Sequence, residues 1–274
     1  MKKLISFFLV LFALTAHAQN FEGTIKWSMK MDLDPATKAK MDDAQKKMKD
    51  PATQAQMKLM QDKMNDPQMK AMMDANPQMK AQMESAMKMI QGGSIGDMIP
   101  KGFTIRLKGQ NILTTMDGGV MAMEILYLKD KDQAYQLDRQ NKTYSPMMTG
   151  NRPVQASSST APKVTKTSET AKILNYTCTK YLVDITEGDR TIHQSIWATT
   201  EIKDIDLKGL AKQRMGRGQS FFHEGIDGFP LRVASNMTEG NVTMEVTEIK
   251  KESLNAADFS LPADFKETQG MFGK

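Results

Sequence analysis

The sequence has few of the residues that build disulfide bonds, metal sites and catalytic sites. It contains one cysteine, Cys178, and three histidines, of which only His193 and His223 lie beyond residue 18. A single cysteine excludes a disulfide within the chain, so burial must hold the core together. No phosphate-binding glycine loop and no paired-histidine metal motif occur in the sequence. These absences predict a protein that is not an enzyme, has no metal site and uses no cofactor.

Cys178 lies in an alternating apolar segment. This position predicts a buried, unreactive thiol, and a disulfide between two chains is the alternative.

Long apolar runs are absent beyond the N-terminus. Lys2 and Lys3 precede an apolar run at 4–14, and Ala16-His17-Ala18 then gives a small-x-small cleavage pattern. The run is shorter than the roughly 20 residues that a membrane-spanning helix needs. We therefore expect a signal peptide at residues 1–18 and an exported protein in the periplasm or at the outer membrane. An uncleaved anchor is the alternative.

A strong excess of one charge is also absent. The formal net charge is +5, and lysines are mixed with aspartates along the chain. This pattern lacks the basic stripe of nucleic-acid-binding proteins, so no nucleic-acid partner is expected. A mildly basic surface leaves peripheral contact with a membrane open.

The first segment after the leader alternates with period two, which is typical of a strand with one buried face. The alternation ends at Asp34-Pro35. The residues on its apolar side are Phe21, Gly23, Ile25, Trp27, Met29, Met31 and Leu33.

Aromatic residues are missing between Trp27 and Phe103, where methionine, lysine, glutamine, alanine and aspartate dominate. Asp-Pro pairs begin at Asp34, Asp50 and Asp66, a constant spacing of 16 residues, and Asn76-Pro77 follows. Aspartate or asparagine caps a helix N-terminus, and proline suits the first helical position. The segment 34–98 is therefore predicted to be an insertion of three or four short helices.

Methionines recur at helical spacing within these units, which predicts amphipathic stripes. We regard the stripes, together with Trp27, as candidates for an apolar ligand groove: Met41, Met57, Met60, Met64, Met73, Met79, Met83, Met87 and Trp27.

Beyond residue 98 the strand pattern returns in short alternating segments joined by turns. A polar linker is expected at 149–163, a helix at 205–215 and the last clear strands at 229–237 and 242–249. We predict an α+β fold in which 19–33 and 99–268 form one β-rich domain, with a tail at 269–274. Strands that alternate without regular helical crossovers favour an antiparallel sheet.

Four segments of the chain carry recognisable motifs: Ile173-Leu174-Asn175-Tyr176-Thr177-Cys178-Thr179-Lys180-Tyr181, Ile196-Trp197, Gly228-Phe229-Pro230-Leu231 and Asp258-Phe259-Ser260-Leu261-Pro262-Ala263-Asp264-Phe265. These segments resemble a family of exported bacterial proteins, domain of unknown function 4412. Asn175 replaces the family's usual glycine. The resemblance covers roughly residues 100–266 and implies a LolA-like half-barrel, a curved antiparallel sheet around short helices, but no reaction. The Asp-Pro units are similar to the helical repeats of STI1-type chaperone modules.

The methionines are the unusual feature that bears on function. Methionine is flexible and polarisable, which suits it to filling irregular gaps in a core and equally to surfaces that accept varied apolar partners. We expect a non-enzymatic binding protein for a lipid, a lipoprotein chain or a hydrophobic peptide. The alternatives are copper(I) sequestration by the methionine-rich helices, since thioethers are soft ligands, and a structural protein without a ligand.

Overall fold

The computed structural model describes residues 21–64, 66–69, 100–118, 123–147, 161–188, 190–203, 205–207, 210, 222–237 and 240–268. Within these ranges, residues 57, 60, 64, 187 and 190 are described by their backbone alone. The expected signal peptide and C-terminal tail lie outside the described residues. Within the described ranges, no helix has the length and apolar character needed to cross a membrane.

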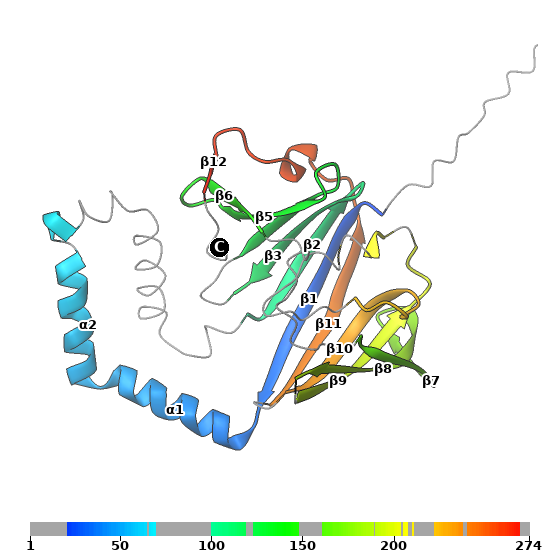
Figure 1. The fold of residues 1–274 in the computed structure, drawn as a ribbon, viewed down its shortest axis with the longest axis horizontal. Coiled ribbons are helices and arrows are strands. Elements are labelled where there is room, and N and C mark those ends of the chain that lie inside the picture. The colour runs from blue at the N-terminus through cyan, green and yellow to red at the C-terminus, as the bar shows by residue number, and fades with distance from the viewer. Residues whose placement is uncertain are drawn as a thin grey trace, which may run out of the picture.

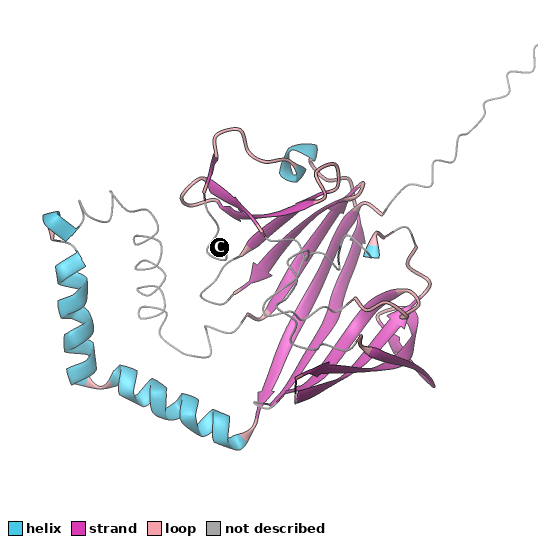
Figure 2. Ribbon diagram, viewed as in Figure 1, coloured by secondary structure: helices cyan, strands magenta, loops and turns pink. Residues whose placement is uncertain are grey.

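Strands form one curved, open sheet of 12 strands in the order β12-β6-β5-β4-β3-β2-β1-β11-β10-β9-β8-β7 (Figures 1 and 2). Among these strands every neighbouring pair is antiparallel except β12 and β6. The curved antiparallel sheet expected from the sequence is confirmed. The strands are β1 Gly23–Leu33, β2 Gly102–Lys108, β3 Asn111–Asp117, β4 Glu124–Leu128, β5 Gln133–Asp138, β6 Thr143–Pro146, β7 Lys163–Ile173, β8 Tyr176–Glu187, β9 Arg190–Thr199, β10 Phe229–Met237, β11 Gly240–Lys251 and β12 Lys266–Glu267.

The first strand lies in the middle of the sheet. In β1, Trp27 is opposite Val246 of β11 on one side and opposite Phe103 of β2 on the other. Strand β2 follows β1 in the sheet although 68 residues separate them in the sequence. The chain therefore leaves the sheet after β1 and returns to the neighbouring position.

Two helices follow β1, α1 at Pro35–Lys49 and α2 at Pro51–Met64, and we call them the arm. Asp34 accepts hydrogen bonds from the backbone N–H groups of Ala36 and Thr37, and Asp50 caps α2 in the same way. The helix starts predicted from the Asp-Pro spacing are thus confirmed at these two positions. In Figure 1 the arm extends away from the sheet, and α1 contains no buried residue.

The larger prediction of a methionine-rich insertion with several helices is not supported beyond this arm. A further turn begins at Pro67, where Asp66 accepts from the N–H of Gln68 at 2.8 Å. Residues 70–99, which include the fourth predicted unit, lie outside the described part of the chain.

The sheet buries apolar side chains on both of its faces. The larger cluster lies on the face that carries Ile25, Trp27 and Phe103, which we call the inner face. Residues of the segments 200–210 and 222–228 pack against it, among them Leu210, which is 2% exposed. The second cluster lies on the opposite, outer face of β3, β4 and β5 and contains Leu113, Leu126, Leu128, Leu137 and Phe259.

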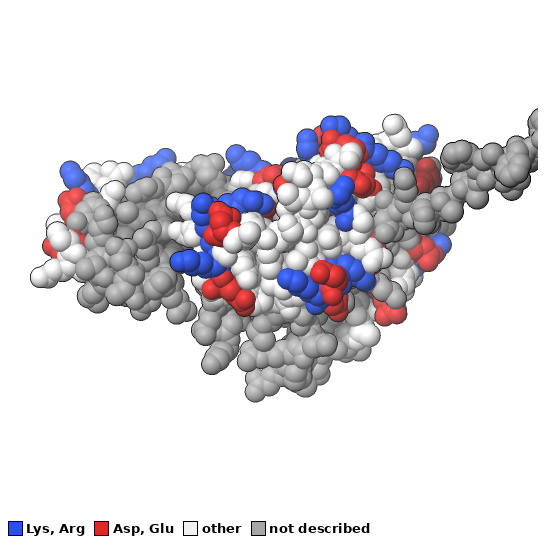
Figure 3. Space-filling view, turned by 90° about the horizontal axis from the view of Figure 1, so that it is seen from above, with Lys and Arg blue, Asp and Glu red and all other residues white. Residues whose placement is uncertain are grey.

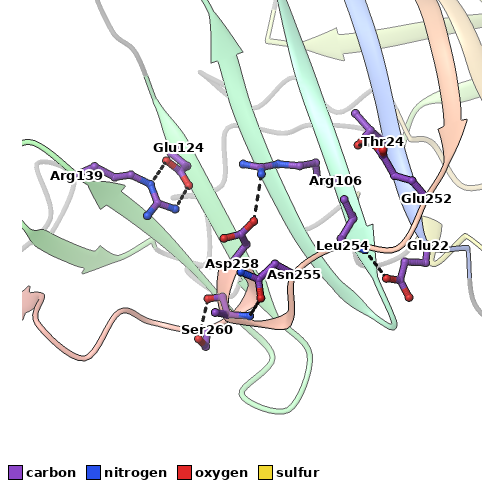
Figure 4. Close-up of polar contacts among 11 residues, drawn as sticks. Glu22, Thr24, Arg106, Glu124, Arg139, Glu252, Leu254, Asn255, Asp258 and Ser260 are labelled. Carbon is purple, nitrogen blue, oxygen red and sulfur yellow. Dashed lines mark hydrogen bonds and ion pairs between the residues drawn. The ribbon is translucent and has the colours of Figure 1, made fainter.

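The C-terminal segment closes the outer face. Its short 3-10 helix η2, Ala256–Phe259, places Phe259 in the outer cluster, with 5% of its surface exposed. Figure 4 shows how polar contacts hold this segment. Asp258 pairs with Arg106 of β2 at 3.4 Å, and the N–H of Leu254 donates to Glu22 at 2.7 Å. The phenylalanine of the closing sequence phrase is thus a core residue.

Two details of the chain differ from the sequence predictions. The edge strand β7 was not predicted, and it includes Lys163, which we expected in the linker. Segment 173–181, which resembles a single strand of the family, is not one strand here, because Leu174 and Asn175 form the turn between β7 and β8 and Leu174 has a φ of 53°. Most of the helix expected at 205–215 lies outside the described residues.

Both the backbone conformation and the close packing at position 228 require glycine. Its φ is +93°, and a Cβ atom there would lie 2.1 Å from the carbonyl oxygen of Thr199. Only glycine fits this entry into β10.

Candidate apolar binding face

The alternation of β1 positions an aromatic cluster on the inner face. Ile25 and Trp27 point to the same side because successive strand residues alternate between faces, and they are 0% and 4% exposed. The Trp27 ring stacks on Phe103 with centroids 5.4 Å apart and lies 6.2 Å from the Phe229 ring. The cluster joins β1, β2 and β10 at the centre of the sheet.

Apolar positions continue across the strands in register. Trp27 is opposite both Val246 and Phe103, and Phe103 is in turn opposite Met116 of β3. A neighbouring row contains Val233, Met244 and Met29. The inner face is therefore a continuous apolar surface across the sheet, as the larger cluster requires.

Methionines at one end of the strands leave this surface partly exposed. Met31 is 37% exposed, and Met29, Met116, Met123 and Met237 are half-buried against the inner cluster. We call these five residues the methionine rim. They lie where the central strands end, and Met29 and Met31 are on the strand that leads into the arm.

Polar groups are few on the inner face, and some have no hydrogen-bond partner. Gln194 and Ser235 are each 2% exposed, and Gln194 accepts a hydrogen bond from Nε2 of His223 at 2.9 Å. Nε2 of Gln194, Oγ of Ser235 and Nε1 of Trp27 are buried without a partner. Burial lowers the pKa of His223 from its ordinary value of 6.5, so its imidazole is neutral at neutral pH.

Catalytic and metal-ligating groups do not converge in the described part of the chain. No group of three or more histidine, cysteine or acidic side chains there could hold a metal ion. Cys178 is free and buried, and burial raises the pKa of its thiol to about 11. A protonated, buried thiol is a poor nucleophile. His193 instead pairs with Asp184 on the exposed side of β8 and β9, at 2.7 Å.

The outer surface mixes charges of both signs. On the face seen in Figure 3, lysine and arginine side chains lie beside aspartate and glutamate rather than in a separate basic stripe. Trp197 lies between Lys180 and Arg232, each 5.4 Å from its ring, and Arg232 pairs with Glu245. Lys180 and Arg232 thus have electrostatic partners within the sheet itself.

The predicted groove residues are distributed over separate parts of the chain. Trp27 is in the inner cluster, whereas Met41 is half-buried on α1. The backbone of α2 places Met57, Met60 and Met64 on one helix, but their side chains are outside the described structure. The remaining four lie wholly outside the described residues: Met73, Met79, Met83 and Met87. The structure does not bring Trp27 together with Met41.

Sequence reasoning missed the methionine rim as a candidate site. Met29 and Met31 lie two and four residues after Trp27, so they belong on the same face of the strand. This alternation was the signal that could have identified them. Met116, Met123 and Met237 reach the same end of the sheet only through the pairing of distant strands.

The family profile described as "Domain of unknown function (DUF4412)" matches residues 97–265 of this chain. The chain belongs to the DUF4412 family. The match runs from just before β2 to the end of the segment that closes the outer face, so the DUF4412 region contains all described strands except β1 and β12. None of the curated proteins compared with this chain matches it.

The solved structures similar to this DUF4412 protein include a mycobacterial one. It is the crystal structure of LprF from Mycobacterium bovis, with 9% identity and a TM-score of 0.27. The similarity covers 63% of this chain and 85% of LprF.

Proposed function

We propose that this chain is an exported, non-enzymatic binding protein that holds an apolar ligand against the inner face of its sheet. The ligand class is a lipid, a lipoprotein chain or a hydrophobic peptide. The leader pattern at 1–18 supports export to the periplasm or the outer membrane. The observation that carries the proposal is the methionine rim, where a continuous apolar surface becomes accessible.

The rim has the physical properties that a carrier needs. Burying apolar surface stabilises a complex by roughly 25 cal/mol per Å². Covering the partly exposed methionines with an apolar molecule therefore favours binding. Methionine also adapts its shape without a large strain cost. An open sheet that ends in such side chains can accept ligands of different lengths.

The proposal is tested by comparing matched methionine substitutions on the sheet and on the arm. Met31→Glu places a charge in the rim, and Met41→Glu places the same charge on α1. The measurement is the affinity for 1-aminoanthracene, an uncharged fluorescent apolar probe. We expect Met31→Glu to weaken binding by about tenfold, because a carboxylate must be desolvated beside the probe, and Met41→Glu to leave it unchanged.

Two results would count against the proposal. Failure of the unmodified protein to bind the probe, together with only ligand-free protein in native mass spectrometry after purification from its own compartment, would exclude a carrier. Loss of binding in Met41→Glu but not in Met31→Glu would show that the ligand binds to the arm and not to the sheet.

A further inference from the structure

Two polar side chains interrupt the apolar inner face at adjacent positions. Gln194 of β9 is directly opposite Ser235 of β10. Their other neighbours in the row are apolar, since Val183 of β8 is opposite Gln194 and Val242 of β11 is opposite Ser235. Directly opposite residues of antiparallel strands have Cβ atoms about 4.5–5.5 Å apart on one face. The pair is therefore a small polar patch within an apolar surface.

Each member of this pair presents a donor that no described residue satisfies. The amide oxygen of Gln194 accepts from Nε2 of His223, which leaves the amide nitrogen on the other side of the same planar group. This nitrogen and Oγ of Ser235 are buried without a partner. A buried donor that has lost its water and found no acceptor is costly, so most such groups in proteins are paired.

The charge environment indicates which acceptor fits. Among the described residues, every buried polar side chain is uncharged: Thr24, Thr114, Ser145, Gln194, Thr199 and Ser235. His223, which packs onto the patch from the segment before β10, is neutral at neutral pH. His193 and Asn236, the adjacent strand residues, are exposed, and His193 pairs with Asp184. A buried carboxylate would meet no cation among the described residues around the patch, whereas an uncharged carbonyl needs only donors.

We propose that Gln194 and Ser235 form a subsite that holds the uncharged ester carbonyl of an acyl chain, while the surrounding apolar residues cover the chain itself. This inference rests on the proposed function and narrows its ligand to an esterified lipid. The Gln194 amide and the Ser235 hydroxyl both donate to the ester oxygen, and His223 keeps the amide in the orientation that allows it.

The experiment measures displacement of 1-aminoanthracene by methyl laurate, laurate and dodecane. The variants are Gln194→Met and Ser235→Ala, and the matched control is Ser195→Ala, on the same strand in the opposite phase. The unmodified protein and the control should prefer methyl laurate over both laurate and dodecane. Each variant should lose about fivefold in affinity for methyl laurate, the equivalent of one hydrogen bond, and retain its affinity for dodecane.

The melting temperature without ligand provides a second readout. Because Oγ of Ser235 is unpartnered in the free protein, Ser235→Ala should not lower the melting temperature, whereas removing a hydroxyl with a purely structural role would lower it. Gln194→Met also removes the acceptor of the His223 Nε2 hydrogen bond, so only Ser235→Ala is used for this readout. Equal binding of the three compounds, or unchanged ester affinity in both variants, would overturn the subsite and leave the carrier intact. Failure of all three compounds to bind would reject the carrier itself.

Discussion

In the sheet, Ile25 and Trp27 of β1 are 0% and 4% exposed, whereas α1, which begins two residues after β1 ends, has no buried residue. The sheet is held by side chains that distant strands bring together. The arm is held by its own hydrogen bonds and by aspartate caps at regular intervals. The comparison teaches that methionine-rich sequence does not by itself build a groove. Met29 and Met244 pack within the sheet, while Met41 lies on a helix without a buried face.

The largest expected difference between the sheet and the arm comes from removing an aromatic side chain of the core. Phe103→Ala deletes a side chain that is 1% exposed and stacked on Trp27. We expect the free energy of unfolding to fall by about 3–5 kcal/mol, measured by urea unfolding followed through tryptophan fluorescence. Met41→Ala should change it by less than about 0.5 kcal/mol. A similar loss in both variants would show that the arm belongs to the same core.

A smaller effect is expected from removing a cap of the arm. In Asp50→Ala, α2 loses the carboxylate that accepts from the N–H groups of Ala52 and Thr53 at 2.9 and 3.4 Å. The helix should lose about 1 kcal/mol, seen as faster amide hydrogen exchange in Pro51–Met64. Exchange in β1 and β11 should not change, because no core contact depends on the cap. Faster exchange in those strands would mean that the two regions unfold together.

The smallest effect concerns pH and the segment that closes the outer face. A hydrogen bond from Lys108, and then the N–H of Leu254, lower the pKa of Glu22 below its ordinary value of 4.5. A carboxyl whose pKa is lowered by folding stabilises the folded state above its unfolded pKa and loses that contribution as pH falls through the folded value. Stability should therefore decline below about pH 4.5, and Glu22→Gln should decline less steeply. An unchanged slope in the variant would exclude this contribution.

Local sequence patterns predicted the elements that local chemistry controls. The starts of α1 and α2 follow from Asp34 and Asp50 because capping and proline act within a few residues. Strand β1 follows from its alternation, since one of its faces is buried. Strand β7 was missed because it is an edge strand with mostly exposed threonines and lysines, so the apolar phase is lost.

Pairings between distant segments could not be read from the sequence. Nothing local places Trp27 beside Val246 or Phe259 beneath β3 to β5, since those contacts join segments far apart in the chain. The pair Gln194 and Ser235 did carry a signal. Gln194 falls in the apolar phase of Ile192 and Ile196, and this phase was the available signal that a polar residue faces the core.

The most direct test of the binding face is amide hydrogen exchange with and without bound 1-aminoanthracene. If the ligand lies on the inner face, protection should increase in β1, β10 and β11, at Gly23–Leu33, Phe229–Met237 and Gly240–Lys251. Protection that increases only in the arm, at Pro35–Lys49 and Pro51–Met64, would contradict this claim.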